Sequence, residues 1–192
     1  NFGSPDQWLT KVEADTVFCF FGRNEALNGD AGLESFRKDL AEMIDGMRSQ
    51  KYNGKSAPQL VIFSPIAHED LKSPHLPDGS AQNVNLEKYT IAMQAVCADR
   101  GVRFVDLFTP AKSLYATADK PLTMNGIHLL DHGNKALAEV IVRKLFDRSP
   151  PEEVAKLREA VLDKNLHWFS RYRVVDEYNV FGGRSRLNWD GV

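Results

Sequence analysis

The sequence predicts an α/β fold in which a parallel sheet lies between two layers of helices. Three short apolar runs, at residues 16–21, 59–64 and 103–108, are separated by longer stretches with helical periodicity. The first two runs show no polar alternation, which is typical of strands that are covered on both faces. Because a helix follows each strand, we expect right-handed crossovers and parallel pairing.

The first half of the chain contains two of these strands, one helix and a long loop. The strands are Thr16–Phe21 (TVFCFF) and Gln59–Ser64 (QLVIFS). Between them, Leu33–Met47 places its apolar residues on one helical stripe. Residues 65–85 contain several prolines and are too many for a plain connection, so we expect a surface loop that could carry function.

The second half continues the alternation of helices and strands. Leu86–Arg100 is a predicted helix that Gly101 ends as a C-terminal cap, and the third strand follows it. The remaining predicted elements are a short helical turn, a polar loop and an amphipathic helix, at residues 110–115, 121–134 and 135–146.

These elements indicate a domain over residues 1–148 and an extension over residues 149–192. In the extension, Ser149 can cap a helix whose first turn holds two prolines and two glutamates and which we expect to run to about Leu162. Residues 164–192 then mix aromatic side chains with arginines. These side chains could stack on sugar rings, but we favour packing against the domain.

Composition excludes several classes of function. The chain of 192 residues fits one globular domain, and its net charge of -2 without any long block of like charge argues against nucleic acid as a partner. No apolar run is long enough for a membrane span. Two cysteines, Cys19 and Cys97, do not indicate a disulfide framework and are expected to be small buried hydrophobes.

Candidate reactive groups follow the ends of the predicted strands, where such sheets collect them. Asn24 comes after the first strand, Ser64 ends the second, and His128 lies in the loop after the third. Ester cleavage needs N–H donors for the oxyanion and a base for the nucleophile, and an Asn amide and a His imidazole can supply these. Taken alone, Gly22-Arg23-Asn24 could equally be a turn, and His128 a loop histidine bonded to the backbone.

Three blocks of sequence resemble the SGNH (GDSL-type) hydrolase superfamily over roughly residues 1–146. They are Asn1-Phe2-Gly3, Gly22-Arg23-Asn24 and Asn125-Gly126-Ile127-His128, the last followed by a helix. The resemblance implies a three-layer α/β/α fold with a flavodoxin-like parallel sheet. It also implies that Gly3 and Asn24 donate to the oxyanion and that His128 is the base, with Asn125 orienting it, and that no cofactor or metal is needed.

The chain departs from the family pattern in three places. It contains no Gly-Asp-Ser block, which in the family lies on the first strand, upstream of the glycine block. The sequence is therefore expected to be N-terminally truncated, with the nucleophile upstream of Asn1. Asn125 stands where the family has an acidic residue, and Glu25 replaces the aspartate after the block-three asparagine. An asparagine can orient an imidazole but cannot stabilise imidazolium by charge.

Further stretches resemble a bacterial subgroup of these hydrolases that often forms part of large exported proteins. They include NFGSPDQWL, SPIAHED and LTMNGIHLL. The likeness implies export and a small-molecule or carbohydrate ester as the substrate, with a short acyl group such as acetyl as the part removed.

Two other functions stay open at this point. A degenerate serine position would leave a non-catalytic module that binds glycans. His128, Asp131 and His132 could instead hold a metal for a phosphoesterase, although a convincing third partner is lacking. His68 and Glu69 could line a substrate cleft, but a solvated surface position is favoured for both, and Ser64 is expected to be structural.

Overall fold

The computed structural model describes residues 3–149 and 155–172. The chain divides into two compact units, residues 1–150 and 151–192, and each is described by itself. The second unit contributes one described helix, α6 (Ala155–Tyr172). The elements of the first unit are, in chain order, α1 (Pro5–Lys11), β1 (Thr16–Phe20), the 3₁₀ helix η1 (Glu25–Asn28), α2 (Gly29–Arg48), β2 (Gln59–Phe63), α3 (Ser80–Asp99), β3 (Arg103–Val105), α4 (Phe108–Thr117) and α5 (Asp131–Phe146).

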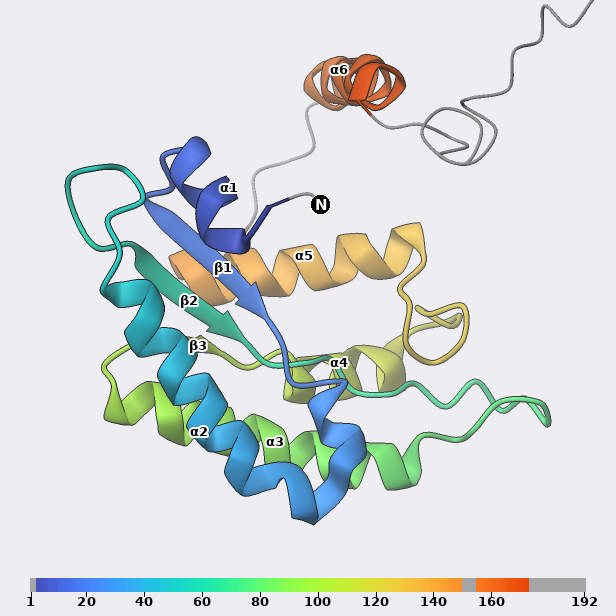
Figure 1. Ribbon diagram of the computed structural model, residues 1–192. Coiled ribbons are helices and arrows are strands. Elements are labelled where there is room, and N and C mark those ends of the chain that lie inside the picture. Colours follow the sequence, from blue (N-terminus) through green and yellow to red (C-terminus); the bar gives the residue numbers. More distant parts are fainter. Residues whose placement is uncertain (1–2, 150–154, 173–192) are drawn as a thin grey trace, which may run out of the picture. The chain divides into compact units, whose positions relative to one another are not determined.

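The sheet of the first unit is parallel and has the strand order β1-β2-β3 (Figure 1). Phe20 lies opposite Phe63, and Phe63 lies opposite Val105, so the three strands end at the same level. Their C-terminal ends therefore meet at one edge, where η1 and the loops that follow β2 and β3 begin.

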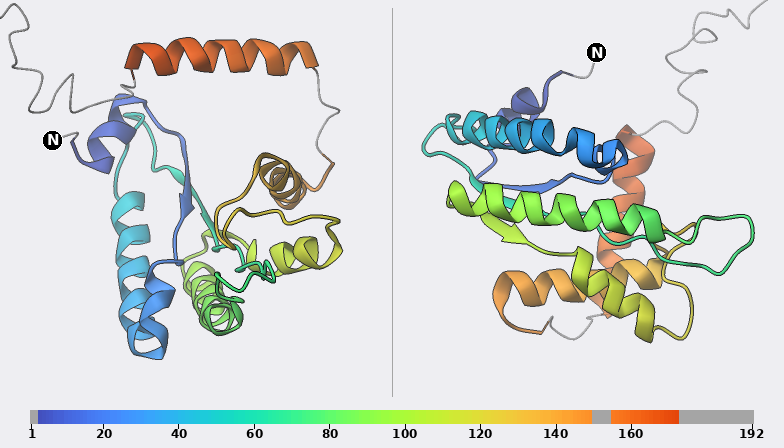
Figure 2. Two further views of the ribbon diagram at one scale, coloured as in Figure 1. Left: turned by 90° about the vertical axis from the view of Figure 1, so that its right-hand side faces the viewer. Right: turned by 90° about the horizontal axis from the view of Figure 1, so that it is seen from below.

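Helices cover both faces of this sheet (Figure 2). On one face, Cys19, Leu60 and Ile62 pack against apolar side chains of α2 and α3. On the other face, Val61, Phe63 and Val105 pack against α5. This alternation along each strand produces three layers and confirms the predicted α/β/α fold.

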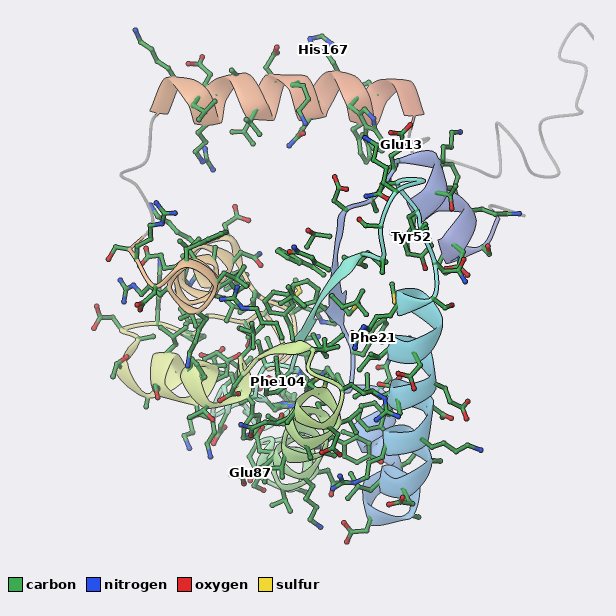
Figure 3. The ribbon with its side chains drawn as sticks, turned by 90° about the vertical axis from the view of Figure 1, so that its left-hand side faces the viewer. Glu13, Phe21, Tyr52, Glu87, Phe104 and His167 are labelled. Carbon is green, nitrogen blue, oxygen red and sulfur yellow. The ribbon has the colours of Figure 1, made fainter. Side chains whose placement is uncertain are left out.

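Strand β1 is less covered than its apolar sequence predicts. Phe18 and Phe20 are 49% and 55% exposed, because α5 packs over β2 and β3 and leaves this face of β1 open. Phe20 stacks on Phe63 with 4.3 Å between ring centroids, and Phe21 follows at the end of the strand (Figure 3). The expectation that this strand is covered on both faces is therefore wrong for the structure as described.

Several predicted boundaries also move. Helix α3 begins at Ser80 rather than Leu86, so the expected loop of residues 65–85 is shorter. Strand β3 ends at Val105, and of the residues expected to extend it, Phe108 begins α4 with Leu107 as its N-cap. Helix α5 begins at Asp131, and α6 continues to Tyr172 rather than Leu162.

Helix α1 has no counterpart among the predicted elements. Its N-cap is Ser4, whose hydroxyl accepts a hydrogen bond from the Gln7 N–H while the Gln7 side chain accepts one from the Ser4 N–H. Pro5 occupies the first helical position. Ser-x-x-Gln with a proline after the serine is a helix start signal, so this helix could have been predicted from the sequence.

Both cysteines are buried and free, which confirms their expected role as small hydrophobes. Burial raises the pKa of the Cys97 thiol to about 11 and that of the Cys19 thiol in the same direction. Helix α6 presents exposed apolar side chains, Trp168 and Phe169 among them, while residues 173–192 of the predicted extension lie outside the described residues. Among the described helices, none combines the length and apolar character that a membrane crossing requires.

Candidate active site

Gly22 turns the chain sharply after β1. Its φ of +99° belongs to the region that favours glycine, and a Cβ there would lie 2.9 Å from the Met93 sulfur. The Glu25 carboxylate accepts a hydrogen bond of 3.0 Å from the Gly22 N–H and so fixes the turn. Asn24 follows at the N-terminus of η1, but its side chain makes no capping hydrogen bond. The turn explains the glycine, and it leaves the side chain of Asn24 without a capping hydrogen bond within the part of the chain that the structure describes.

His128 lies in a tight loop that Asn125 organises. The Asn125 Oδ1 accepts hydrogen bonds from the backbone N–H groups of Ile127 and His128, at 3.2 and 3.0 Å. It also lies 3.1 Å from the Nδ1 of His128. Because a carbonyl oxygen can only accept, the His128 proton belongs on Nδ1 in this arrangement, and Nε2 is left to accept a proton.

Asn24 and His128 line the same cleft, which has a volume of about 520 Å³. Gln82 and Asn85 from the first turns of α3, together with Leu27, are further members of its wall. A smaller cleft of about 290 Å³ adjoins the C-terminal ends of the strands, and Asn24 lines it as well. The structure thus brings two of the predicted site residues together around one cavity, with Asn24 at both clefts.

The first part of the segment after β2, residues 64–69, is mostly buried rather than solvated. His68 and Glu69 are only 4% and 5% exposed, so their expected position on the surface is wrong. Asn83 from α3 holds the backbone of His68 through two hydrogen bonds, of 2.7 and 2.9 Å. Glu69 accepts hydrogen bonds from Leu122 and Thr123 in the loop that carries His128. The burial of His68 and Glu69 was not predicted because both side chains are polar, and polar side chains with hydrogen-bond partners can be buried as fully as apolar ones.

Arg23, which is partly buried, and His68, which is buried, form a pair that lines the larger cleft. The Nη2 of Arg23 lies 3.4 Å from the Nδ1 of His68, and since a guanidinium only donates, this Nδ1 is the acceptor. Burial, and next the charge of Arg23, lower the pKa of His68, which favours its neutral form. Burial also lowers the pKa of Arg23. The Nη1 of Arg23 and the Nε2 of His68 are buried without a hydrogen-bond partner among the described residues.

Ser64 at the end of β2 is structural, as expected. It is 2% exposed, and its Oγ accepts hydrogen bonds from the backbone N–H groups of Leu107 and Phe108 at 2.8 and 3.1 Å. These bonds tie the end of β2 to the start of α4.

Comparison with known proteins places this geometry in a family. Residues 2–136 match the GDSL-like Lipase/Acylhydrolase family, and this match covers well over half of the chain. The chain belongs to this family. The match includes the turn at Asn24 and the loop of His128.

Individual relatives agree with the GDSL-like assignment. A protein of Arabidopsis thaliana, "GDSL esterase/lipase CPRD49", is 27% identical over 170 residues, which cover 83% of this chain and 60% of the plant protein. Axe2, an acetylxylan esterase from Geobacillus stearothermophilus, is 14% identical, with a TM-score of 0.55 over 75% of this chain and 65% of Axe2. LAE5, an alpha/beta hydrolase enzyme from the metagenome of Lake Arreo, Spain, is 15% identical, with a TM-score of 0.53 over 70% of this chain and 61% of LAE5. These solved structures support the GDSL-like fold, and the chain spans less than two thirds of each of the three relatives.

Gly3, the third candidate in the GDSL-like pattern, lies apart from the other two. It precedes α1, and its nearest neighbours are the side chains of Gln7 and Trp8. It is not among the described residues that line either cleft. Its φ of +85° nevertheless requires a backbone that glycine adopts without strain.

The metal alternative receives no geometric support from the described part of the chain. His132 lies on the first turn of α5, and its Nε2 is 2.8 Å from the carbonyl oxygen of Pro121. Within residues 3–149 and 155–172, no group of three or more histidine, cysteine, aspartate or glutamate side chains is placed to hold a metal ion.

Proposed function

We propose that this chain supplies the base and an oxyanion donor of a serine esterase. The observation that carries the proposal is His128, which Asn125 holds by a hydrogen bond and which lines the same cleft as Asn24. In this role the Nε2 of His128 takes the proton of the attacking hydroxyl and returns it to the leaving alkoxide. Asn125 holds the imidazole in the required tautomer.

The oxyanion of the tetrahedral intermediate is assigned to Asn24 and Gly3. The side-chain amide of Asn24 is a donor that no capping bond engages among the described residues, and preorganised donors of this kind stabilise a developing oxyanion. Gly3 would add its backbone N–H. Because Gly3 is not among the described residues that line either cleft, its contribution requires a different path of the segment before α1.

The nucleophile is a serine that we place in a segment preceding Asn1. Two features support this assignment. The open edge and face of β1 offer a place for another strand, and the smaller cleft lies beside the end of β1. Two solved structures of Axe2 are of catalytic mutants, one of a serine and one of an aspartate.

The proposed substrate is a short acyl ester, such as an acetyl group, on a carbohydrate. The described residues that line the larger cleft include no acidic side chain, whereas Asn24, Gln82 and Asn85 offer three uncharged amides that can both donate to and accept from sugar hydroxyls. The acetylxylan esterase Axe2 shares the fold. The exported location of the protein stays a prediction that rests on resemblance to the bacterial subgroup.

The test is acetyl-ester hydrolysis by the protein extended upstream of Asn1, compared with its His128→Ala and Asn125→Asp variants. His128→Ala should reduce kcat by a factor of about 100 or more, since general-base catalysis is worth about 10²–10⁴. Asn125→Asp should raise kcat, because a carboxylate stabilises the imidazolium that forms in the transition state.

Failure of the proposal has a distinct signature. A folded extended protein that hydrolyses no acyl ester, but that binds xylo-oligosaccharides or other glycans in calorimetry, would favour the non-catalytic binding module. Activity that is unchanged in His128→Ala would overturn the assignment of the base.

A further inference from the structure

Glu69 is a buried carboxylate whose acceptor sites are filled by one loop. Its two oxygens accept hydrogen bonds from the Leu122 N–H, at 2.9 and 3.1 Å. One of them also accepts from the Thr123 N–H at 2.7 Å and from the Thr123 hydroxyl at 2.6 Å. Short bonds of this kind to a carboxylate are among the strongest in proteins. Glu69 therefore anchors the start of the loop that ends at His128.

A second set of bonds joins the middle of this loop to the same anchor. The Glu69 N–H donates to the carbonyl of Gly126 at 3.0 Å, and the Gly126 N–H donates to the Thr123 hydroxyl at 2.9 Å. Gly126 lies so close that a Cβ would come within 2.9 Å of the Glu69 carbonyl oxygen and closer still to the imidazole of His68. The loop that carries His128 therefore packs directly against His68 and Glu69 at Gly126.

The anchored residues lead directly to the imidazole. Thr123 pairs with Leu129 in an antiparallel bridge, and the Met124 N–H donates to the carbonyl of His128 at 2.9 Å. Asn125 lies within this hairpin, and its Oδ1 accepts hydrogen bonds from the Ile127 N–H, the His128 N–H and the His128 Nδ1. The position of Asn125 is therefore fixed from both sides by residues that Glu69 holds.

We propose that Glu69 is a positioning residue for His128. It acts through Thr123 and Gly126, keeps Asn125 against the imidazole, and so selects the tautomer in which Nε2 is free. Its consequence for catalysis rests on the proposed function, but its effect on the imidazole does not. Glu69 does not line either cleft, so it acts without touching the substrate.

The test uses Glu69→Gln in the protein that includes the segment before Asn1. The amide keeps the shape but replaces one of the two accepting oxygens with an NH2 group, which cannot accept the hydrogen bonds that Leu122 and Thr123 donate. Glu87→Gln is the matched control, because Glu87 is exposed on α3 (Figure 3). In spectra of protein labelled with 15N-histidine, wild type and Glu87→Gln should show His128 protonated on Nδ1. Glu69→Gln should show both tautomers and faster hydrogen exchange at the Gly126 amide.

Kinetics provide the second readout. Per folded molecule, Glu69→Gln should lower kcat by a factor of about 10 to 100 at nearly constant KM, as expected for a misplaced catalytic group. The effect should be non-additive with Asn125→Ala, so that the double variant is little worse than the worse single one. A purely structural role for Glu69 would instead give additive losses.

An unchanged His128 tautomer in a folded Glu69→Gln protein, or additive kinetics, overturns the proposal. If Glu69→Gln does not fold, Thr123→Val removes the shared hydroxyl with little change in volume, and the same two readouts apply to it. If the wild type has no esterase activity, the proposed function fails, while the tautomer comparison still tests the role of Glu69.

Discussion

The side-chain amide of Asn24 is used differently from those of Asn53, Asn83 and Asn125. The Asn53 oxygen accepts from two backbone N–H groups of its own turn, Asn83 holds the backbone of His68, and Asn125 organises the loop of His128. Asn24 occupies a helix N-terminus, where asparagine is a favoured cap, yet its side chain does not cap. The side chain of Asn24 makes no capping hydrogen bond and lines both clefts, so its amide can bind a ligand.

His68 predicts a pH dependence of stability. Its pKa in the folded protein is lowered by burial and by Arg23, so below its ordinary pKa of about 6.5 the unfolded chain binds a proton that the folded one does not. The free energy of unfolding should therefore fall as pH falls from about 7.5 to about 5, and level off below the folded pKa. Urea unfolding at these two pH values measures the difference.

The control for this prediction is His68→Asn, which keeps an acceptor for Arg23 but does not titrate. Its free energy of unfolding should change less between the two pH values than that of the wild type. The pKa values of Asp70 and Asp78 are lowered from 3.8, chiefly by hydrogen bonds from Lys72 and Ser80, so their contribution is lost only at lower pH. Equal pH dependence in wild type and variant would show that His68 is not the group responsible.

Among the helices and strands, those whose apolar residues pack into the core were predicted from apolar periodicity. The first two strands and α2 and α5 follow apolar patterns, and the structure confirms them with shifted ends. The first turns of α3 escaped prediction because Gln82 and Asn85 face the cleft rather than the core, which removes the apolar stripe there. Glu69 escaped for a related reason, since hydrogen bonds offset its burial and sequence shows no partner 53 residues away.

Two glycines on different elements predict opposite effects of alanine. Gly126→Ala places a Cβ against the imidazole of His68 at a φ of +83°, and it should lower the free energy of unfolding by more than about 2 kcal/mol. Gly46→Ala lies in helix α2 with nothing within 4 Å, and it should raise that free energy by up to about 1 kcal/mol through helix propensity. Urea unfolding at neutral pH compares them. Equal effects of the two substitutions would contradict the close approach of the loop to His68.

At the scale of the whole molecule, the sequence predicted the layered fold and the order of the candidate site residues along it. It also predicted that Asn24 and His128 approach one another, because parallel strands end at one edge. It did not predict the position of Gly3, which depends on how the segment before α1 runs. Local sequence determines a turn or a cap, whereas the path of a segment between elements depends on contacts with distant parts of the chain.

The exposed edge and face of β1 predict that the chain self-associates. An edge strand with Phe18, Phe20 and Phe21 about half exposed offers both unpaired backbone groups and an apolar surface for self-association. Expressed as these 192 residues, the chain should scatter light as oligomers and bind a hydrophobic dye. Phe18→Lys should reduce both signals several-fold, because a charge on an edge strand opposes pairing. Ile91→Lys, at a similarly exposed apolar residue on α3, should leave both nearly unchanged. A monodisperse monomer with a cooperative thermal transition and no dye binding would show instead that β1 is protected in some other way.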